Sequence, residues 1–261
     1  GPSGELKMSN QRGRPTGVRR GDPRRARLNV VETLRAAAPW QRVRKSDPAE
    51  RRVAVRAEDF RVTRYKRRSE TTTIFTVDAS GSAALQRLAE AKGAVEQLLS
   101  DCYVRRDHVA LIAFRGTEAQ VLLPPTRSLV RAKRGLAGLP GGGTTPLAAG
   151  IDAASALAED ARRRGHTPVV VLMTDGRANI ARDGSPGRAQ AADDARASAR
   201  AIQGSGLAAL FIDTAPRAQP AARALASEMA ATYLHLPYAD AAGISRVVQS
   251  VAAGGEAARS R

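Results

Sequence analysis

Two carboxylates and several hydroxyl side chains stand where apolar segments of this sequence end. Asp78, Ser80 and Ser82 follow an apolar run at alternate positions. Asp175 follows a second apolar run, and Thr144 and Thr145 follow three consecutive glycines. Carboxylate and hydroxyl oxygens are hard ligands, which suit Mg²⁺ or Mn²⁺ better than Zn²⁺ or Cu²⁺. If the fold brings these residues together, they can form a metal site with positions left for water or a partner group.

Each of these motifs also has a purely structural interpretation. Ser82 could simply cap a helix, and the glycines at 141–143 could form only a flexible turn. Asp175 before Gly176 could be a turn residue. The interpretation as a site therefore depends on all three motifs falling at the same edge of one sheet.

The hydrophobic pattern from residue 71 onward alternates between strand and helix. Apolar or β-branched runs predict strands at residues 72–77, 108–114, 120–123, 168–173, 206–213 and 232–235. Helical spacing predicts helices at residues 84–99, 129–136, 146–164, 188–203, 221–229 and 239–252. Strands this apolar need cover on both faces. We therefore predict an α/β fold with a doubly wound, mainly parallel, Rossmann-like sheet.

The shortest predicted strand, at residues 120–123, is expected to lie at an edge of the sheet. It follows a tight turn at residues 115–117, which suggests an antiparallel pairing, and we expect Pro124 and Pro125 to end it. In doubly wound sheets, ligands bind beyond the carboxyl ends of the strands, where the strand order reverses. The loops that carry Asp78 and Asp175 are expected there.

The positive charge is concentrated near the N-terminus. Residues 1–70 hold 20 Lys and Arg against 8 Asp and Glu, which gives +12 of the net +17. We expect residues 1–27, which begin with a cloning scar, to be a flexible basic arm, and residues 28–70 to be an extension with a short helix and edge strands. Residues 71–255 then form the α/β domain. The basic arm is compatible with an acidic partner, but the 3% aromatic content and the lack of a zinc-finger or RNA-binding signature argue against nucleic acid.

Several classes of protein are disfavoured by the composition. No run of about 18 apolar residues is present, so we expect no membrane span. The N-terminal sequence lacks the apolar core of a signal peptide, and Cys102 is the only cysteine, so we expect a cytoplasmic protein without an internal disulfide. The three histidines, His108, His166 and His235, are far apart in sequence, and we expect structural roles for them.

The motifs resemble the metal-ion-dependent adhesion site of the von Willebrand A (integrin I-like) domain family over about residues 71–250. The resemblance implies Mg²⁺ or Mn²⁺ at a site built from Asp78, Ser80, Ser82, Thr145 and Asp175. Thr145 is favoured over Thr144 because Thr-Pro-Leu leads directly into the predicted helix. Thr144 remains the alternative ligand.

Longer runs resemble the C-terminal part of the D-subunit family of bacteriochlorophyll-type magnesium chelatases. They are RLAEAKGAVEQLLSDCYVRRDHVALIAFRG, VLMTDGRANIARDG and, upstream, TLRAAAPWQ. The resemblance implies a complex that uses ATP to insert Mg²⁺ into protoporphyrin IX, with an AAA+ ATPase subunit and a porphyrin-binding subunit as partners. It also implies that this segment is a docking module whose metal accepts a carboxylate from a partner subunit. We expect no turnover and no ATP binding by the segment, because it lacks a Gly-x-x-x-x-Gly-Lys-Ser/Thr loop.

Other functions stay open at this point. The domain could be the equivalent part of a cobalt chelatase subunit or a generic von Willebrand A adhesion module. A hydrolase with Asp78 as nucleophile would need a lysine at the strand ends, and we find none there. Arg20-Gly21-Asp22 could offer a carboxylate to an adhesion site on a second copy, although chance is the simpler explanation in so basic a stretch.

Overall fold

The computed structural model describes residues 6–9, 13–44, 53–80, 100, 102–104, 107–138, 141–235 and 250. The chain divides into two compact units, one formed by Leu6–Arg68 and the other containing the chain from Ser69 onward. The predicted helices at residues 84–99 and 239–252 lie outside the described residues. Within the described part, no helix is long and apolar enough to cross a membrane.

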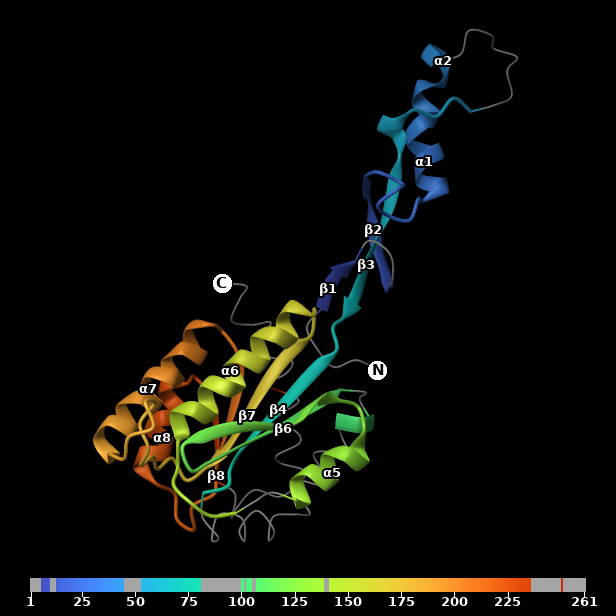
Figure 1. The fold of residues 1–261 in the computed structure, drawn as a ribbon. Helices are drawn as coiled ribbons and strands as arrows, with labels where there is room; N and C mark the ends of the chain where they lie inside the picture. The colour runs from blue at the N-terminus through green and yellow to red at the C-terminus, as the bar shows by residue number, and fades with distance from the viewer. Residues whose placement is uncertain are drawn as a thin grey trace. The chain divides into compact units, whose positions relative to one another are not determined.

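The second unit contains a six-stranded sheet with the order β6-β5-β4-β7-β8-β9 (Figure 1). Its strands are β4 (Thr71–Asp78), β5 (His108–Arg115), β6 (Glu118–Thr126), β7 (Thr167–Thr174), β8 (Ala208–Asp213) and β9 (Thr232–His235). All neighbours pair in parallel except β5 and β6, which are antiparallel. This arrangement confirms the predicted fold class, including the antiparallel edge strand.

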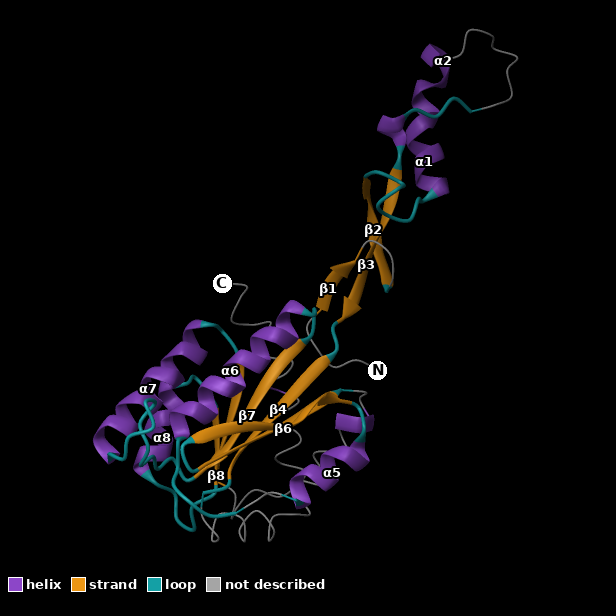
Figure 2. Ribbon diagram, viewed as in Figure 1, coloured by secondary structure: helices purple, strands orange, loops and turns teal. Residues whose placement is uncertain are grey.

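Helices pack against this sheet (Figure 2), and the apolar side chains between them and the sheet are buried. They are α5 (Leu129–Ala137), α6 (Leu147–Arg163), α7 (Arg188–Gly204) and α8 (Pro220–Glu228). Side chains alternate between the two faces along each strand. On the face toward α6, one buried cluster contains Ile74, Ile112 and Leu172 of the strands and Leu147 and Ile151 of α6. Residues that point to the opposite face are also buried, including Phe75, Leu111, Val171 and Ile212. The sheet is therefore apolar on both faces, as parallel sheets require.

The edge strand β6 is longer than expected and continues through Pro124 and Pro125 to Thr126. Our expectation that the two prolines end the strand was therefore wrong. Proline lacks a backbone N–H, but at a sheet edge the strand has only one bonded neighbour. The β5–β6 ladder is irregular around Leu111, which is paired with Leu123. The edge position and this irregularity allow the strand to carry two prolines.

The first unit is a three-stranded antiparallel sheet with helical turns beside it. The strands are β1 (Leu6–Ser9), β2 (Arg14–Arg20) and β3 (Arg61–Arg68), in the order β1-β3-β2. The helical segments are α1 (Val30–Ala37), η1 (Ala38–Trp40), α2 (Gln41–Arg44) and η2 (Ala57–Asp59). Two of the strands thus lie within residues 1–27, where we expected a flexible arm.

Local hydrogen bonds explain why the helical segments of this unit begin and turn where they do. Asn29 caps α1 by accepting a hydrogen bond from the backbone of Glu32 at 3.0 Å. Gln41 pairs its side-chain amide with both the N–H (2.9 Å) and the carbonyl (3.1 Å) of Ala54. It also donates to the carbonyl of Ala37 at 2.8 Å. Gln41 therefore fastens the helical turns to the chain that leads into β3.

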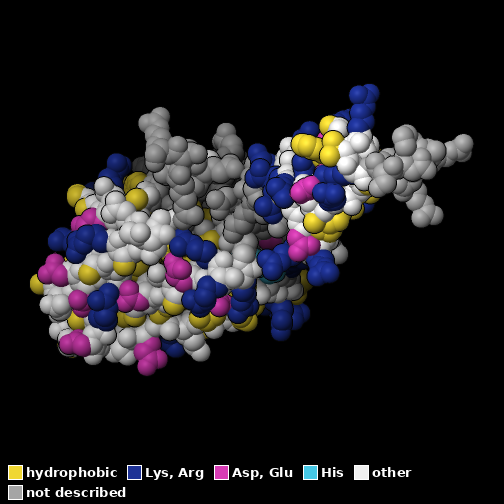
Figure 3. All heavy atoms as spheres, turned by 90° about the horizontal axis from the view of Figure 1, so that it is seen from above, with side chains coloured by type: hydrophobic (Ala, Val, Ile, Leu, Met, Phe, Trp, Pro, Cys, Tyr) yellow, Lys and Arg dark blue, Asp and Glu magenta, His cyan; other side chains and the backbone are white. Residues whose placement is uncertain are grey.

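Surface charges of both signs are mixed on the face drawn in Figure 3. In the second unit, Arg182 pairs with Asp152 at 2.9 Å, and Arg200 pairs with Glu228 at 2.8 Å. Exposed ion pairs of this kind contribute roughly 0–1 kcal/mol each. The stability of this unit therefore depends mainly on its apolar core.

The contact between Gly150 of α6 and Phe114 of β5 offers a test of that packing. A Cβ atom at Gly150 would lie 2.5 Å from a carbon of the fully buried Phe114 ring. We expect Gly150→Ala to lower the free energy of unfolding by about 1–3 kcal/mol through overpacking. Gly204 ends α7, and a Cβ added there would meet no described residue beyond its own helix and chain neighbours within 4 Å. Gly204→Ala should therefore be neutral or stabilising by about 0.5–1 kcal/mol. Urea unfolding of both variants checks this, and equal stabilities would contradict the packing.

Candidate metal site at the carboxyl ends of the strands

The candidate site lies where the strand order of the sheet reverses. From β4 the chain proceeds to β5 on one side, whereas from β7 it proceeds to β8 on the other. Asp78 is the last residue of β4, and Thr174 is the last residue of β7, its parallel neighbour. The loops after these two strands therefore diverge to opposite sides and leave a crevice between them.

Asp78 is a buried carboxylate surrounded by donors. Its side chain accepts hydrogen bonds from the backbone N–H of Ser80 at 3.0 Å and from the Ser80 hydroxyl at 2.5 Å. The Thr174 hydroxyl donates to its other oxygen at 2.9 Å. Burial raises the pKa of Asp78, the donors partly oppose that shift, and the negative charge of Asp175 adds to it. Among the described residues, none forms an ion pair with Asp78, so its charge is only partly compensated.

Thr145 brings a third oxygen to this group. Its hydroxyl donates to the Ser80 hydroxyl oxygen at 2.7 Å. Asn179 fixes the backbone there, because its side-chain oxygen accepts from the Thr145 N–H at 2.6 Å and its own N–H donates to the Thr145 carbonyl at 3.2 Å. The hydroxyl of Thr144 is directed elsewhere and donates to the carbonyl of Gly116 at 2.5 Å. The geometry thus places Thr145, rather than Thr144, beside Ser80.

Asp175 stands next to this group rather than within it. It is half-buried, and its carboxylate accepts a hydrogen bond from the backbone of Arg177 at 3.0 Å. Gly176 follows with φ +77°, and a Cβ there would lie 2.8 Å from the Cα of Ala222 in α8. Only glycine fits that close approach, so it fixes the turn that holds Asp175. Ser82 lies outside the described residues.

A second Asp-x-Ser sequence shows how little this local motif means by itself. Asp183 accepts from the N–H of Ser185 at 2.9 Å and from its hydroxyl at 2.6 Å, nearly as Asp78 does from Ser80. Asp183 is exposed, however, and the Ser185 hydrogen bonds lower its pKa. What distinguishes Asp78 is burial, together with the contacts from Thr174 and the neighbouring Asp175. Sequence reasoning assigned no role to Thr174 and missed Asn179, and their contacts span 96 and 34 residues.

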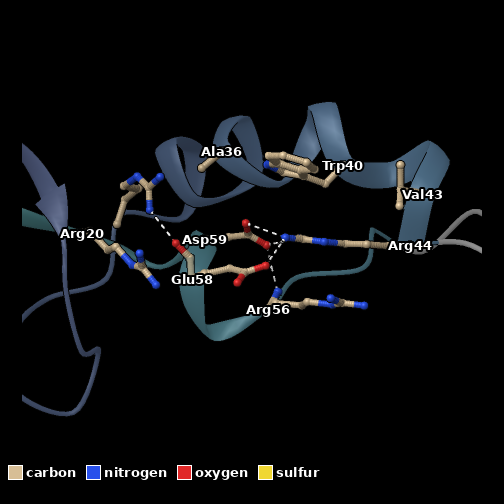
Figure 4. Close-up of a pocket in the computed structure, with 9 residues that line it drawn as sticks. Arg20, Ala36, Trp40, Val43, Arg44, Arg56, Glu58 and Asp59 are labelled. Atoms are coloured by element: carbon tan, nitrogen blue, oxygen red, sulfur yellow. Dashed lines mark hydrogen bonds and ion pairs between the residues drawn. The ribbon is translucent and has the colours of Figure 1, made fainter.

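The first unit has a pocket of its own, shown in Figure 4. Arg44 is nearly buried and forms ion pairs with Asp59 and, at 2.7 Å, with Glu58. The hydrogen bond from Arg44 lowers the pKa of Asp59. The Arg44 guanidinium also lies 5.9 Å from the centre of the Trp40 ring. Because Arg44 is already paired with these acidic residues, the described contacts point to a structural role in holding η2 against the helices.

Comparisons with known proteins agree with this division of the chain. Residues 73–177 match the von Willebrand factor type A domain family, and residues 12–68 match the AAPxQ domain family. The letters of the second name correspond to Ala37-Ala38-Pro39-Trp40-Gln41, the segment that Gln41 fastens. The match over residues 73–177 includes β7 and all of β4 except its first two residues, and it therefore contains Asp78, Ser80, Thr145 and Asp175.

Relatives with high sequence identity are magnesium-chelatase subunits. The chain is 54% identical to the 60 kDa subunit of Cereibacter sphaeroides, across 94% of this chain and 44% of that protein. It is 52% identical to the 60 kDa subunit of Rhodobacter capsulatus, across 92% and 43%. It is 40% identical to the 67 kDa subunit of Chlorobaculum tepidum, across 92% and 41%. The chain thus spans less than half the length of these curated relatives.

Solved structures share the fold at low identity. The PilB minor pilin of Streptococcus sanguinis matches with a TM-score of 0.54 and 10% identity, over 74% of this chain and 64% of that one. The von Willebrand domain of the Mfa5 pilus tip protein from Porphyromonas gingivalis matches with a TM-score of 0.52 and 13% identity, over 74% and 97%. These similarities support the architecture and carry no information about function.

The buried charge of Asp78 predicts an unusual response to its removal. A carboxyl group whose pKa is raised in the folded state destabilises the fold when the pH is above about 3.9, the ordinary pKa of an aspartate side chain. Asp78→Asn should therefore raise the melting temperature of the metal-free protein at pH 7, with a gain that disappears below about pH 4. Thermal unfolding in EDTA across this pH range measures the effect.

Asp183→Asn is the matched control for this prediction. Its carboxylate makes the same local hydrogen bonds but is exposed, so its removal should leave stability unchanged or slightly lower at pH 7. An Asp78→Asn variant that melts below the wild type at neutral pH in EDTA would contradict the account of the site.

Proposed function

We propose that this chain is a metal-dependent docking module. It belongs with the magnesium-chelatase 60 and 67 kDa subunits, and it carries a von Willebrand factor type A domain. The observation that supports this most directly is the convergence of three oxygens from Asp78, Ser80 and Thr145, each within 2.7 Å of the next. These oxygens come from two loops separated by more than 60 residues. A helix cap alone would not require Thr145.

The donor set fits Mg²⁺ or Mn²⁺. The residues that would hold the ion are Asp78, Ser80 and Thr145, with Ser82 and Asp175 completing the set. All five offer oxygen, which is the donor that Mg²⁺ prefers, and a carboxylate next to hydroxyls leaves positions for water. A bound ion would supply an electrophilic position that attracts a carboxylate from a partner protein.

The residues around this set have positioning roles. Thr174 orients the Asp78 carboxylate through its second oxygen, so that the first faces Ser80. Asn179 holds the backbone of Thr145 and so keeps its hydroxyl at Ser80. Burial of Asp78 excludes water from one side of the carboxylate and strengthens its attraction for a cation. The part of the proposed site formed by Asp78, Ser80 and Thr145 would therefore be brought together before an ion binds.

The partners we propose follow from the relatives' names and from the resemblance of the sequence. In a magnesium-chelatase complex, the module would connect an AAA+ ATPase subunit with the porphyrin-binding subunit during ATP-driven insertion of Mg²⁺ into protoporphyrin IX. A carboxylate of one partner would occupy the open metal position. ATP would be used by the complete complex and not bound by this segment, which would have no turnover of its own.

Binding of Mn²⁺ to the chain tests the metal site. We expect one oxygen-ligated Mn²⁺ by electron paramagnetic resonance titration, with binding lost in Asp78→Ala and weakened at least about tenfold in Thr145→Val. At a concentration 100 times the Kd, the ion should stabilise the fold by about 2.7 kcal/mol. Asp183→Ala is the control and should bind as the wild type does.

Assembly of the complete subunit tests the docking role separately. A full-length subunit with Asp175→Ala should co-purify less with its partner subunits and should lose chelatase activity, because a carboxylate beside the proposed ion is removed. Unchanged assembly together with unchanged activity would contradict the docking function. Mn²⁺ binding that persists while assembly is lost would assign Asp175 to partner binding rather than to the ion.

A further inference from the structure

Three potential metal ligands meet at the end of the sheet opposite to Asp78. Glu70 directly precedes β4, His108 is the first residue of β5, and His166 directly precedes β7. Because β4 lies between β5 and β7, with Thr72 beside His108 and Thr71 beside Thr167, the two histidines approach Glu70 from either side. We expected these histidines to be structural because they are 58 residues apart in sequence, but the register of the sheet makes them neighbours.

The distances between these groups are close to those of a metal centre. Nδ1 of His108 and Nε2 of His166 each lie 3.7 Å from Oε2 of Glu70. One ligand atom of each residue lies within 4.8 Å of the other two. Ligand atoms of a tetrahedral zinc site are roughly 3.3 Å apart, as bond lengths of 2.0–2.1 Å require. Small side-chain rotations would therefore bring all three atoms into coordination.

The hydrogen bonds around the histidines leave available the ring nitrogens that face Glu70. Nδ1 of His166 bonds the hydroxyl of Thr72 at 2.8 Å, which directs Nε2 toward Glu70. A second partner of this kind is what orients histidine ligands in metal sites. Nδ1 of His108 is buried and has no hydrogen-bond partner among the residues that the structure describes. A buried polar atom without a partner is costly unless something binds it.

We propose that Glu70, His108 and His166 form a second metal site, which takes Zn²⁺ or a similar nitrogen-binding transition metal ion. Two imidazoles and one carboxylate are a known zinc donor set that leaves a fourth position open. The side chains are 20–25% exposed, so an ion from solvent can reach them. This inference stands on different residues from the docking site and does not depend on it.

The two sites are expected to prefer different ions. The Asp78 group offers only oxygens, whereas this group offers two nitrogens, which favour Zn²⁺, Co²⁺ or Ni²⁺ over Mg²⁺. Metal binding requires a neutral imidazole, and burial together with the nearby charge of Arg127 lowers the pKa of His108. Excess Mg²⁺ should therefore leave Zn²⁺ in place.

Arg127 is the competitor for this site. One guanidinium nitrogen lies 2.5 Å from Oε2 of Glu70, the same oxygen that faces both histidines. The Arg127 side chain is about half exposed, so solvent borders it and leaves room for another rotamer. A metal ion and Arg127 would therefore compete for Glu70, and removing the arginine should strengthen metal binding.

Calorimetric titration of the EDTA-stripped chain with Zn²⁺, in excess Mg²⁺, tests the proposal. We expect one Zn²⁺ per chain, with a Kd at least about tenfold higher in His108→Gln and in His166→Gln. His235→Gln is the matched control, because His235 is the third histidine of the chain and bonds the carbonyl of Ala215 instead. Neither His235→Gln nor Asp78→Ala should change the Zn²⁺ affinity.

Arg127→Gln keeps all three ligands and should lower the Kd for Zn²⁺, which a purely structural cluster would not predict. X-ray absorption of the zinc-loaded wild type should show two imidazole ligands, and this readout does not depend on any variant folding. No binding, binding unchanged by both histidine substitutions, or a spectrum without imidazole would each overturn the proposal. Binding weakened equally in His235→Gln would do the same.

Discussion

Parallel pairing of β4 with β5 on one side and β7 on the other is the constraint on which the candidate sites depend. Every residue of β4 from Thr71 to Asp78 is buried, so the strand cannot slide without exposing apolar side chains and burying polar ones. Its register therefore fixes what stands at each of its ends. Asp78 and Ser80 are placed beside Thr174 at one end, and Glu70 is placed between two histidines at the other.

The two ends of this strand group offer different chemistry for a physical reason. At the carboxyl end, the loops diverge around a crevice and supply hydroxyl and carboxylate oxygens around one buried charge. At the amino end, imidazole nitrogens flank a carboxylate that Arg127 already holds. The first set suits a hard cation and the second a borderline one. The two ends of one sheet can thus select different ions, because one end offers oxygen donors and the other offers nitrogen donors.

The sequence was sufficient to predict the parallel sheet and its antiparallel edge, because these follow from apolar runs and a tight turn. The hydrogen bonds among Asp78, Ser80 and Thr145 show that these residues lie together, and metal binding by them stays a prediction. Contacts that depend on strand register were not predictable, and the approach of His108 to His166 is the clearest example. The support that Asn179 gives to Thr145 was missed because asparagine in a loop has no distinctive pattern. The extension of the strand through Pro124 and Pro125 was missed, because on an edge strand the missing N–H of proline need not remove a hydrogen bond of the sheet.

The proposed docking function depends on the oxygens of Asp78, Ser80 and Thr145 being metal ligands. Anomalous diffraction from a crystal of the chain grown with Mn²⁺ tests it most directly, because the ion is located without any substitution. We expect an anomalous peak within coordination distance of the Asp78 carboxylate and of both hydroxyl oxygens, with the hydrogen bond between Thr145 and Ser80 replaced by bonds to the ion. An intact hydrogen bond without a peak there, at saturating Mn²⁺, would contradict it.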